Sequence, residues 1–179
     1  MFSEPLRDGF ELRLVEERHA EEMFSAIESN REYLRQWLPW VDATQSKDDT
    51  QAFIRAALEM FAAQEGFTAA IWHRKRVAGV IGTHRIDWRN RRAELGYWLA
   101  QELQGRGLMS DACRLALAHL FDEMNLHRVE IRCAAGNAKS NAIPQRLGFK
   151  LEARHRDAEL VNGRYHDLLV YAMLKSEWS

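Results

Sequence analysis

Two glycines, Gly105 and Gly107, separate a segment with the pattern of a strand from a segment with the pattern of an amphipathic helix. Apolar residues alternate through 92–99 and recur at helical spacing after residue 107. A glycine-rich loop at such a junction can direct several backbone N–H groups at one anion, and the helix dipole adds partial positive charge there. The pattern predicts a phosphate site, although an ordinary tight turn would use the same glycines. The residues of this predicted site are Gln104, Gly105, Arg106, Gly107, Leu108 and Met109.

A second group of polar residues follows about thirty residues later, between another apolar strand at 127–134 and a short helix. Asn137 and Ser140 precede this helix, and a Leu-Gly-Phe sequence at 147–149 follows it. This order of strand, glycine loop, helix, strand, Asn-x-x-Ser and Leu-Gly-Phe resembles the GNAT superfamily of N-acetyltransferases. Within it, the chain resembles the RimJ/RimL-type enzymes that acetylate the N-termini of ribosomal proteins. The segments that carry this narrower resemblance are 37–40, 93–99 and 162–167.

The resemblance implies an α+β fold, the GNAT acyl-CoA N-acyltransferase fold, in which helices flank a mixed, mostly antiparallel central sheet. It implies a single GNAT domain over residues 1–179, whose two central strands splay apart to admit the pantetheine arm of acetyl-CoA. The implied reaction is direct attack of a primary amine on the bound acetyl-CoA cosubstrate. The implied acceptor is a protein N-terminal α-amine, which has a pKa of about 8 and loses its proton more easily than a lysine at about 10.4.

Glu94 is the candidate general base. It matches the glutamate of the RimL-type segment at 93–99, which is thought to deprotonate the amine, directly or through a water molecule. The alternation of the strand places Glu94 on the face opposite Leu95 and Tyr97. The alternative is a solvated carboxylate that pairs with Arg92 or with another nearby basic residue.

Ser140 is the candidate donor to the sulfur of coenzyme A. A serine hydroxyl is a poor acid beside a thiol with a pKa of about 8.5, so a hydrogen bond that stabilises the thiolate is the safer assignment. The alternative is an N-cap of the following helix, a role shared with Asn137. Pro144 lies within that helix, where a proline costs little in the first turn and kinks the helix further on. The geometry around Ser140 is therefore hard to predict.

The other candidates are implied by the family. The amide of Asn137 would pair with the pantetheine arm, and the loop at 104–109 would bind the pyrophosphate through its backbone. A strand N–H near Trp98 or Leu99 would stabilise the oxyanion. The last candidates are Trp37 and Trp40, whose segment would form a wall of the acceptor site. The alternative is that both side chains belong to the hydrophobic core.

The composition argues against several other classes of protein. The 179 residues, 46% of them hydrophobic, suit one domain with a sizeable core. The formal net charge of −1 argues against a strongly basic nucleic-acid binder, and we expect neither a signal peptide nor a membrane span. The histidines lack the spacing of metal ligands, so we expect no metal. Cys113 and Cys133 lie on expected regular elements, which favours a reducing compartment, the cytoplasm.

Two other functions stay open. A small-molecule amine, such as an antibiotic, a toxin or a polyamine, would require a closed, acidic pocket, whereas a protein N-terminus would require an open groove. A non-catalytic acyl-CoA-binding domain is the second alternative, and the presence of both Glu94 and Ser140 argues against it. The resemblance also implies a homodimer.

Local signals predict where several elements begin and end. Ser46 with Asp49 is a capping-type start for a helix that should end at Gly66. A long helix is expected from about 107 to 124, directly after the glycine loop. Its apolar face would cover the sheet.

The sequence pattern in the last third of the chain predicts a helix followed by a β-hairpin. A short helix is expected over about 139–147, and Gly148 suits a left-handed C-cap. The remaining segment, about 149–174, reads as two strands. Asn162-Gly163 between them suits a two-residue hairpin turn.

Overall fold

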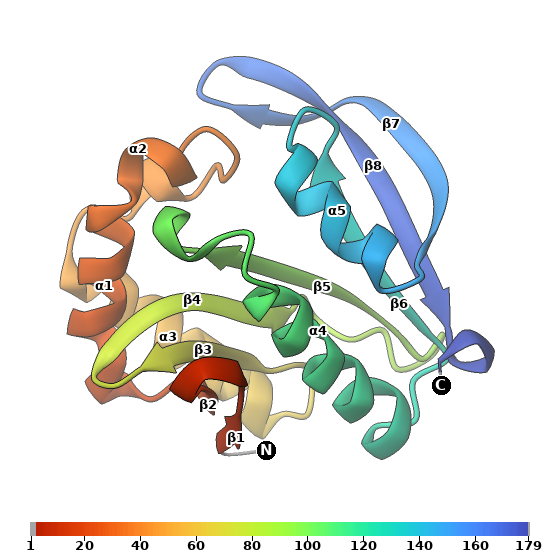
Figure 1. Ribbon diagram of the computed structural model, residues 1–179, viewed down its shortest axis with the longest axis horizontal. Helices are drawn as coiled ribbons and strands as arrows, with labels where there is room; N and C mark the ends of the chain where they lie inside the picture. The colour runs from red at the N-terminus through yellow and green to blue at the C-terminus, as the bar shows by residue number, and fades with distance from the viewer. Residues whose placement is uncertain (1–2, 179) are drawn as a thin grey trace.

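The computed structural model of the protein describes residues 3–178 (Figure 1). Eight strands form one sheet in this part of the chain: β1 (Ser3–Pro5), β2 (Phe10–Leu14), β3 (Thr68–His73), β4 (Arg76–Thr83), β5 (Arg92–Leu99), β6 (Arg128–Ala134), β7 (Lys150–Val161) and β8 (Arg164–Leu174). They lie in the order β1-β2-β3-β4-β5-β6-β8-β7. Neighbours are antiparallel except β5 and β6, which are parallel. This is the α+β fold with a mixed, mostly antiparallel sheet that the sequence predicts.

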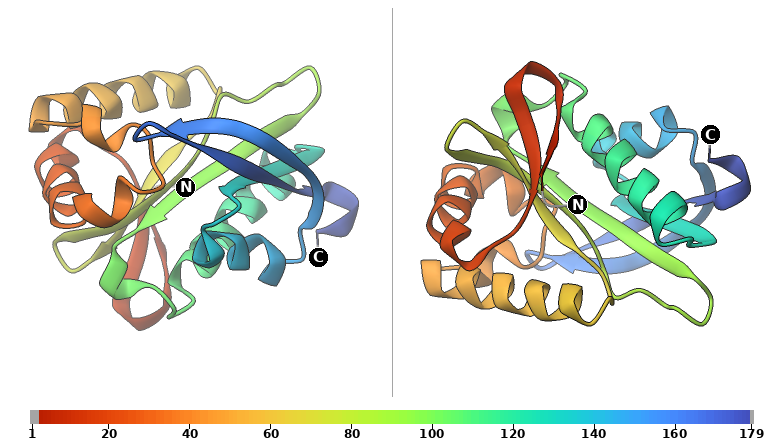
Figure 2. Two further views of the ribbon diagram at one scale, coloured as in Figure 1. Left: turned by 90° about the horizontal axis from the view of Figure 1, so that it is seen from above. Right: turned by 90° about the horizontal axis from the view of Figure 1, so that it is seen from below.

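Helices cover both faces of the sheet (Figure 2). The α-helices are α1 (Ala20–Ser29), α2 (Arg31–Leu34), α3 (Lys47–Ala62), α4 (Leu108–Ala118) and α5 (Ala138–Arg146). Trp98 of β5 belongs to the core with α1, α2 and α3, whereas Leu95 and Tyr97 pack into the core under α4 and α5. The side chains of adjacent strand residues thus pack into hydrophobic cores on opposite faces of the sheet, as the alternation predicts. No helix within residues 3–178 is long and apolar enough to span a membrane.

The predicted start of α3 is confirmed, because Ser46 and Asp49 form a reciprocal capping box. The Asp49 N–H donates to Ser46 Oγ at 3.2 Å, and the Ser46 N–H donates to Asp49 Oδ2 at 2.9 Å. This pair satisfies two backbone donors at the helix start. The helix ends at Ala62, four residues before the expected stop at Gly66.

The expected helix over 107–124 divides into two kinds of helix. Regular α-helix ends at Ala118, and a π-helical turn, His119–Glu123, continues it. Leu120 and Phe121 in this turn are both fully buried. Sequence spacing did not predict this, because a π turn depends on tertiary packing at its position.

The two-residue hairpin turn at Asn162-Gly163 is confirmed. Both residues have positive φ angles, 50° and 74°, as a type I′ turn requires. The turn pairs Val161 with Arg164, and the hairpin arches over α5 towards α2 (Figure 1). At its tip the side-chain amide of Asn162 donates to the carbonyl of Arg35 at 2.6 Å. The tip of the hairpin is therefore tied to the segment after α2.

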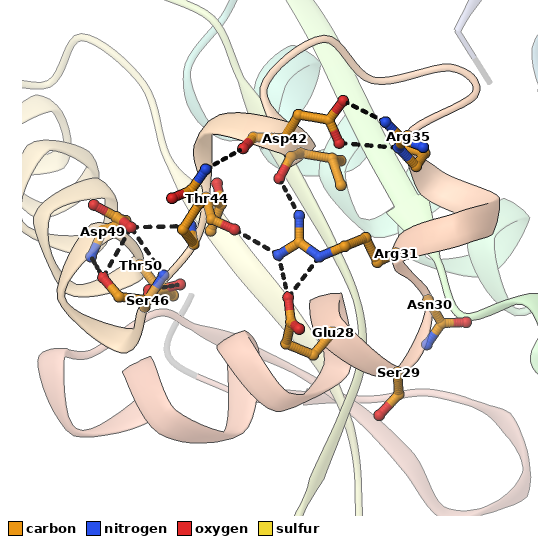
Figure 3. Close-up of polar contacts among 12 residues, drawn as sticks. Glu28, Ser29, Asn30, Arg31, Arg35, Asp42, Thr44, Ser46, Asp49 and Thr50 are labelled. Carbon is orange, nitrogen blue, oxygen red and sulfur yellow. Dashed lines mark hydrogen bonds and ion pairs between the residues drawn. The ribbon is translucent and has the colours of Figure 1, made fainter. Parts of the chain in front are cut away.

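Arg31 organises the loop between α2 and α3 (Figure 3). Its guanidinium donates to the carbonyl of Val41 at 2.6 Å, to the carbonyl of Thr44 at 2.5 Å and to the carboxylate of Glu28. A planar guanidinium can make these bonds at once, whereas a lysine ammonium cannot copy their geometry. The loop that it holds, 35–46, contains both candidate acceptor-site tryptophans.

We expect Arg31→Lys to lower the free energy of unfolding by about 1–2 kcal/mol, because bonds to the loop carbonyls are lost. For a chain of this size the melting temperature should fall by about 3–6 °C. Arg35→Lys is the matched control, since its ion pair with Asp42 is exposed at both ends and should matter little. Equal melting temperatures for Arg31→Lys and the control would contradict the role given to Arg31.

Candidate functional site

The two central strands separate after three paired residues. Residues 92–94 of β5 lie opposite 128–130 of β6. Within the described chain no further pairing joins them, although β5 runs to Leu99 and β6 to Ala134. Each strand stays paired along its other edge, β5 with β4 and β6 with β8. The splay that the family resemblance implies is therefore present.

A mostly apolar cleft of about 220 Å³ lies between the end of β5, the glycine loop, the start of α4, α5 and the segment around α2. Most of the residues proposed from the sequence line it. They are Trp37, Trp98, Leu99, Gln104, Gly105, Gly107, Leu108, Met109, Asn137 and Ser140. Three proposed residues, Glu94, Arg106 and Trp40, are not part of this lining.

The glycine loop ends in an uncapped helix start. The φ angles of Gly105 and Gly107 are +77° and +80°, in the region that favours glycine. Gly107 is the N-cap of α4, and within residues 3–178 no side chain caps this helix. Its first-turn N–H groups have no helical acceptor, so they suit a phosphate. Leu108 and Met109 have buried side chains, so their contribution to a ligand would come from the backbone.

Arg7, which lies between β1 and β2, holds this loop from outside. Its guanidinium donates to the carbonyl of Arg106 at 3.1 Å and to the carboxylate of Asp111 at 3.0 Å. A Cβ on Gly107 would lie 3.0 Å from Arg7 Nη1, so a side chain there would displace the guanidinium by a few tenths of an ångström. Asp111 sits in the first turn of α4, where its charge would repel an anion, and Arg7 offsets that charge. No local signal in the sequence points to Arg7, which is far from the loop along the chain.

The backbone N–H groups of β5 alternate between β4 and the gap. The N–H of Ala100 donates to the carbonyl of Ala78 beside β4 at 2.8 Å. Trp98 has the same parity as Ala100, so its N–H also faces β4. The N–H groups of Tyr97 and Leu99 have the opposite parity and face the gap. Of the two candidates for stabilising an oxyanion, Leu99 therefore has the suitable N–H.

Asn137 is the N-cap of α5, and Ser140 is the third residue of the helix. The N–H of Ser140 donates to Asn137 Oδ1 at 3.1 Å. The alternative that Ser140 caps the helix is therefore wrong, because Asn137 already provides the cap three residues earlier. The hydroxyl of Ser140 lies 3.2 Å from Cys133 Sγ. Burial raises the pKa of Cys133, so its thiol stays protonated at neutral pH.

Glu94 lies at the last paired position of β5 and is bound by a basic residue across the split. Arg132 of β6 places Nε 3.2 Å from Glu94 Oε2, and His84 Nε2 lies 3.7 Å from Oε1. Arg92, suggested as a partner, instead pairs with Asp87. About 29% of the Glu94 side chain is exposed, so solvent reaches the carboxylate.

Glu159 of β7 is a second carboxylate near this point, and the sequence reading missed it. Burial raises the pKa of Glu159, His166 opposes that rise, and the charge of Glu94 adds to it. Glu159 and His166 are cross-strand partners in the hairpin. A usable signal was present, because a two-residue turn at 162–163 fixes the register that pairs them.

Trp37 lies between the cleft and the hairpin. Its ring centroid is 6.0 Å from that of His166, and its ring lies 3.6 Å from where a Cβ on Gly136 would be. Trp40 is more exposed, and its carbonyl accepts a hydrogen bond from the Thr44 hydroxyl. The described residues contain no group of three or more side chains suited to holding a metal ion.

Relatives of known sequence match almost the whole chain. The Acetyltransferase (GNAT) domain model matches residues 10–150. The putative ribosomal N-acetyltransferase YdaF of Bacillus subtilis (strain 168) is 37% identical over 179 residues, covering 99% of this chain and 98% of YdaF. The ribosomal-protein-serine acetyltransferase of Escherichia coli (strain K12) is 32% identical and covers 93% of each chain.

Solved structures with the same fold include two coenzyme complexes. RimL, a ribosomal L7/L12 α-N-protein acetyltransferase in complex with coenzyme A, has a TM-score of 0.91 and 29% identity, covering 96% of this chain and 97% of RimL. The microcin C7 self-immunity acetyltransferase MccE, in complex with acetyl-CoA and AMP, has a TM-score of 0.88 and 28% identity, covering 94% and 93%. With its split sheet, its glycine loop and these relatives, the chain belongs to the GNAT family of acetyltransferases.

Proposed function

We propose that this N-acetyltransferase transfers the acetyl group of acetyl-CoA to a protein N-terminal α-amine of the ribosomal-protein type. The observation that carries the proposal is the solvent access at Glu94 beside the strand split, because 29% of its side chain and 71% of that of its neighbour His84 are exposed, as an open groove for a protein N-terminus requires. The carboxylates of Glu94 and Glu159 would attract the ammonium form of that amine. Relatives that cover nearly the whole chain are named for ribosomal proteins, which supports this acceptor class.

The cleft fits acetyl-CoA as the cosubstrate. The uncapped N-terminus of α4 and the loop glycines suit a pyrophosphate. The apolar walls suit the pantetheine arm, and the Asn137 cap uses only its carbonyl oxygen, which leaves its NH₂ group for an amide of the ligand. The Leu99 N–H would stabilise the oxyanion, and the Ser140 hydroxyl would donate to the sulfur of the departing thiolate.

Glu94 and Glu159 act together as the base in this proposal. Arg132 pairs with Glu94 beside the amine, and the charge of Glu94 helps to raise the pKa of Glu159. A carboxylate with a raised pKa accepts a proton more readily near neutral pH. Glu94 would orient the amine, directly or through water, and the proton that the amine loses would come to rest on Glu159.

A small-molecule amine is the second candidate acceptor. The hydrogen bond from Asn162 to the Arg35 carbonyl closes one side of the acceptor region and would favour a smaller ligand. MccE, a self-immunity enzyme, shares the fold over most of the chain. We further propose a single domain over residues 1–179, a homodimer and a cytoplasmic location, as expected from the sequence.

The acceptor is tested by thiol release from acetyl-CoA against a panel of amines. We expect turnover of ribosomal-protein N-terminal peptides, and weaker or no turnover of lysine peptides, polyamines and aminoacyl-nucleotide mimics. Glu94→Gln should lose most of that turnover, by about 10²-fold or more. Turnover of the small amines alone would replace the proposed acceptor class with a detoxification role.

Arg7→Ala should weaken binding of coenzyme A by about two- to fivefold, since the loop loses an exposed but bidentate anchor. Because Arg7 contacts the loop and not the reacting groups, kcat should stay nearly unchanged. Isothermal titration with coenzyme A measures the effect, and Arg18→Ala, which removes an exposed ion pair elsewhere, is the control. Wild-type affinity in Arg7→Ala would show that the loop holds its shape without this residue.

Glu159→Gln should remove the acidic limb of the pH dependence of kcat/KM. Burial raises the folded-state pKa of Glu159, so its ionisation disfavours the folded state as pH rises through that pKa. The variant should therefore melt no lower than the parent protein at pH 8, while its kcat/KM falls by about 10²-fold.

Glu152→Gln, on the same strand, is the matched control for Glu159→Gln. Its carboxylate pairs with Arg128 and lies outside the site. We expect the acidic limb to persist in the control. An unchanged pH profile in Glu159→Gln would leave Glu94 as the only carboxylate in the base role.

A further inference from the structure

Helix α5 contains a proline at a position where a regular helix needs an N–H group. In an α-helix the N–H of residue 144 would donate to the carbonyl of residue 140. Pro144 has no N–H, so the carbonyl of Ser140 loses its helical partner. A partly buried carbonyl needs another donor.

That donor is the hydroxyl of Tyr97, which lies 3.1 Å from the Ser140 carbonyl oxygen. Tyr97 comes from β5 and packs against the core under α4 and α5. Burial raises the pKa of Tyr97 well above its ordinary value, so the phenol keeps its proton and donates. The hydroxyl of a strand residue thus provides the hydrogen bond that the helix lacks at this carbonyl.

All three polar groups of Ser140 have a partner. Its N–H donates to Asn137, its carbonyl accepts from Tyr97, and its hydroxyl lies within hydrogen-bond distance of the Cys133 thiol. These partners belong to the start of α5, to β5 and to β6. The two strands are the ones that separate at the split, so Ser140 is held from both sides of the gap.

We propose that Tyr97 is a positioning residue that acts through Ser140, and that Pro144 is the reason it is needed. The proposal rests on the proposed role of Ser140 as hydrogen-bond donor to the coenzyme A sulfur. By fixing the backbone of Ser140 from β5, Tyr97 fixes where the hydroxyl lies relative to the cleft that both residues line. Pro144 keeps the carbonyl free of a competing helical donor.

The test is a double-mutant cycle on kcat. Tyr97→Phe should lower kcat about three- to tenfold, with KM for acetyl-CoA within about twofold of the parent value. Pro144→Ala supplies an N–H that can donate to the Ser140 carbonyl, so Tyr97→Phe should cost much less in that background. In a Ser140→Ala background Tyr97→Phe should have no further effect on kcat.

A second measurement needs no acceptor amine. The thiol of bound coenzyme A is titrated by the thiolate absorbance, with the apo protein subtracted to remove Cys113 and Cys133. A donor at the sulfur lowers the pKa of that thiol, so Tyr97→Phe should raise it by about half a unit to one unit. Pro144→Ala should restore it in the double variant.

Tyr171→Phe is the matched control. The Tyr171 hydroxyl also contacts α5, where it accepts from Gln145 Nε2 at 3.0 Å, but it does not touch Ser140. We expect no change in kcat or in the bound-thiol pKa. A general loosening of α5 would affect both tyrosine variants alike and would appear in their melting temperatures.

The outcomes separate this inference from the proposed function. If Ser140→Ala leaves both kcat and the bound-thiol pKa unchanged, the proposed role of Ser140 as donor to the sulfur is contradicted. The inference about Tyr97 is then overturned as well, because it rests on that role. If Ser140→Ala changes them and Tyr97→Phe does not, only the inference is overturned. An equal effect of Tyr97→Phe with Pro144 and with Ala at position 144 also overturns it.

Discussion

The rest of the site depends on the parallel pairing of β5 and β6, which stops after Glu94 and Glu130. Each strand remains bound along its outer edge, so the pair opens without either strand losing its place in the sheet. The opening leaves inward-facing N–H groups of β5, including that of Leu99, without a strand partner. Backbone donors in such a position favour a ligand that can accept from them. The split therefore creates the cleft and supplies its polar groups.

The last pair before the split places two like charges opposite each other. Glu94 and Glu130 are direct cross-strand partners, an arrangement that is destabilising by itself. Arg132 lies between them, 3.2 Å from Glu94 and 3.0 Å from Glu130. Burial raises the pKa of Glu130, but the hydrogen bonds from Arg132 and Arg128 outweigh it and lower the pKa below its usual value. The same arginine that stabilises the end of the pairing thus also holds the candidate catalytic carboxylate in place.

Sequence patterns predicted those features whose cause is local. The glycine loop, the capping box at Ser46 and the hairpin turn at 162–163 each depend on a few adjacent residues, and each appears in the structure. The features that were missed depend on contacts between distant segments. Arg7 reaches the loop from the N-terminal strands, and Glu159 comes near Glu94 only through the order of the sheet strands. The choice of Asn137 over Ser140 as N-cap depended on the first helical residue, which a pattern locates only to within a few positions.

The cosubstrate side and the acceptor side of the site are built by different means. The cleft uses backbone groups of a loop and a helix start, which change little when surface side chains change. The loop at 35–46 and the β7–β8 hairpin, which would form the acceptor side, contact each other through Trp37 with His166 and through Asn162 with Arg35. Because each segment helps to place the other, a substitution in one shifts the walls of the acceptor region without touching the glycine loop. This separation is consistent with one fold serving relatives named as a ribosomal-protein acetyltransferase and as a microcin self-immunity acetyltransferase.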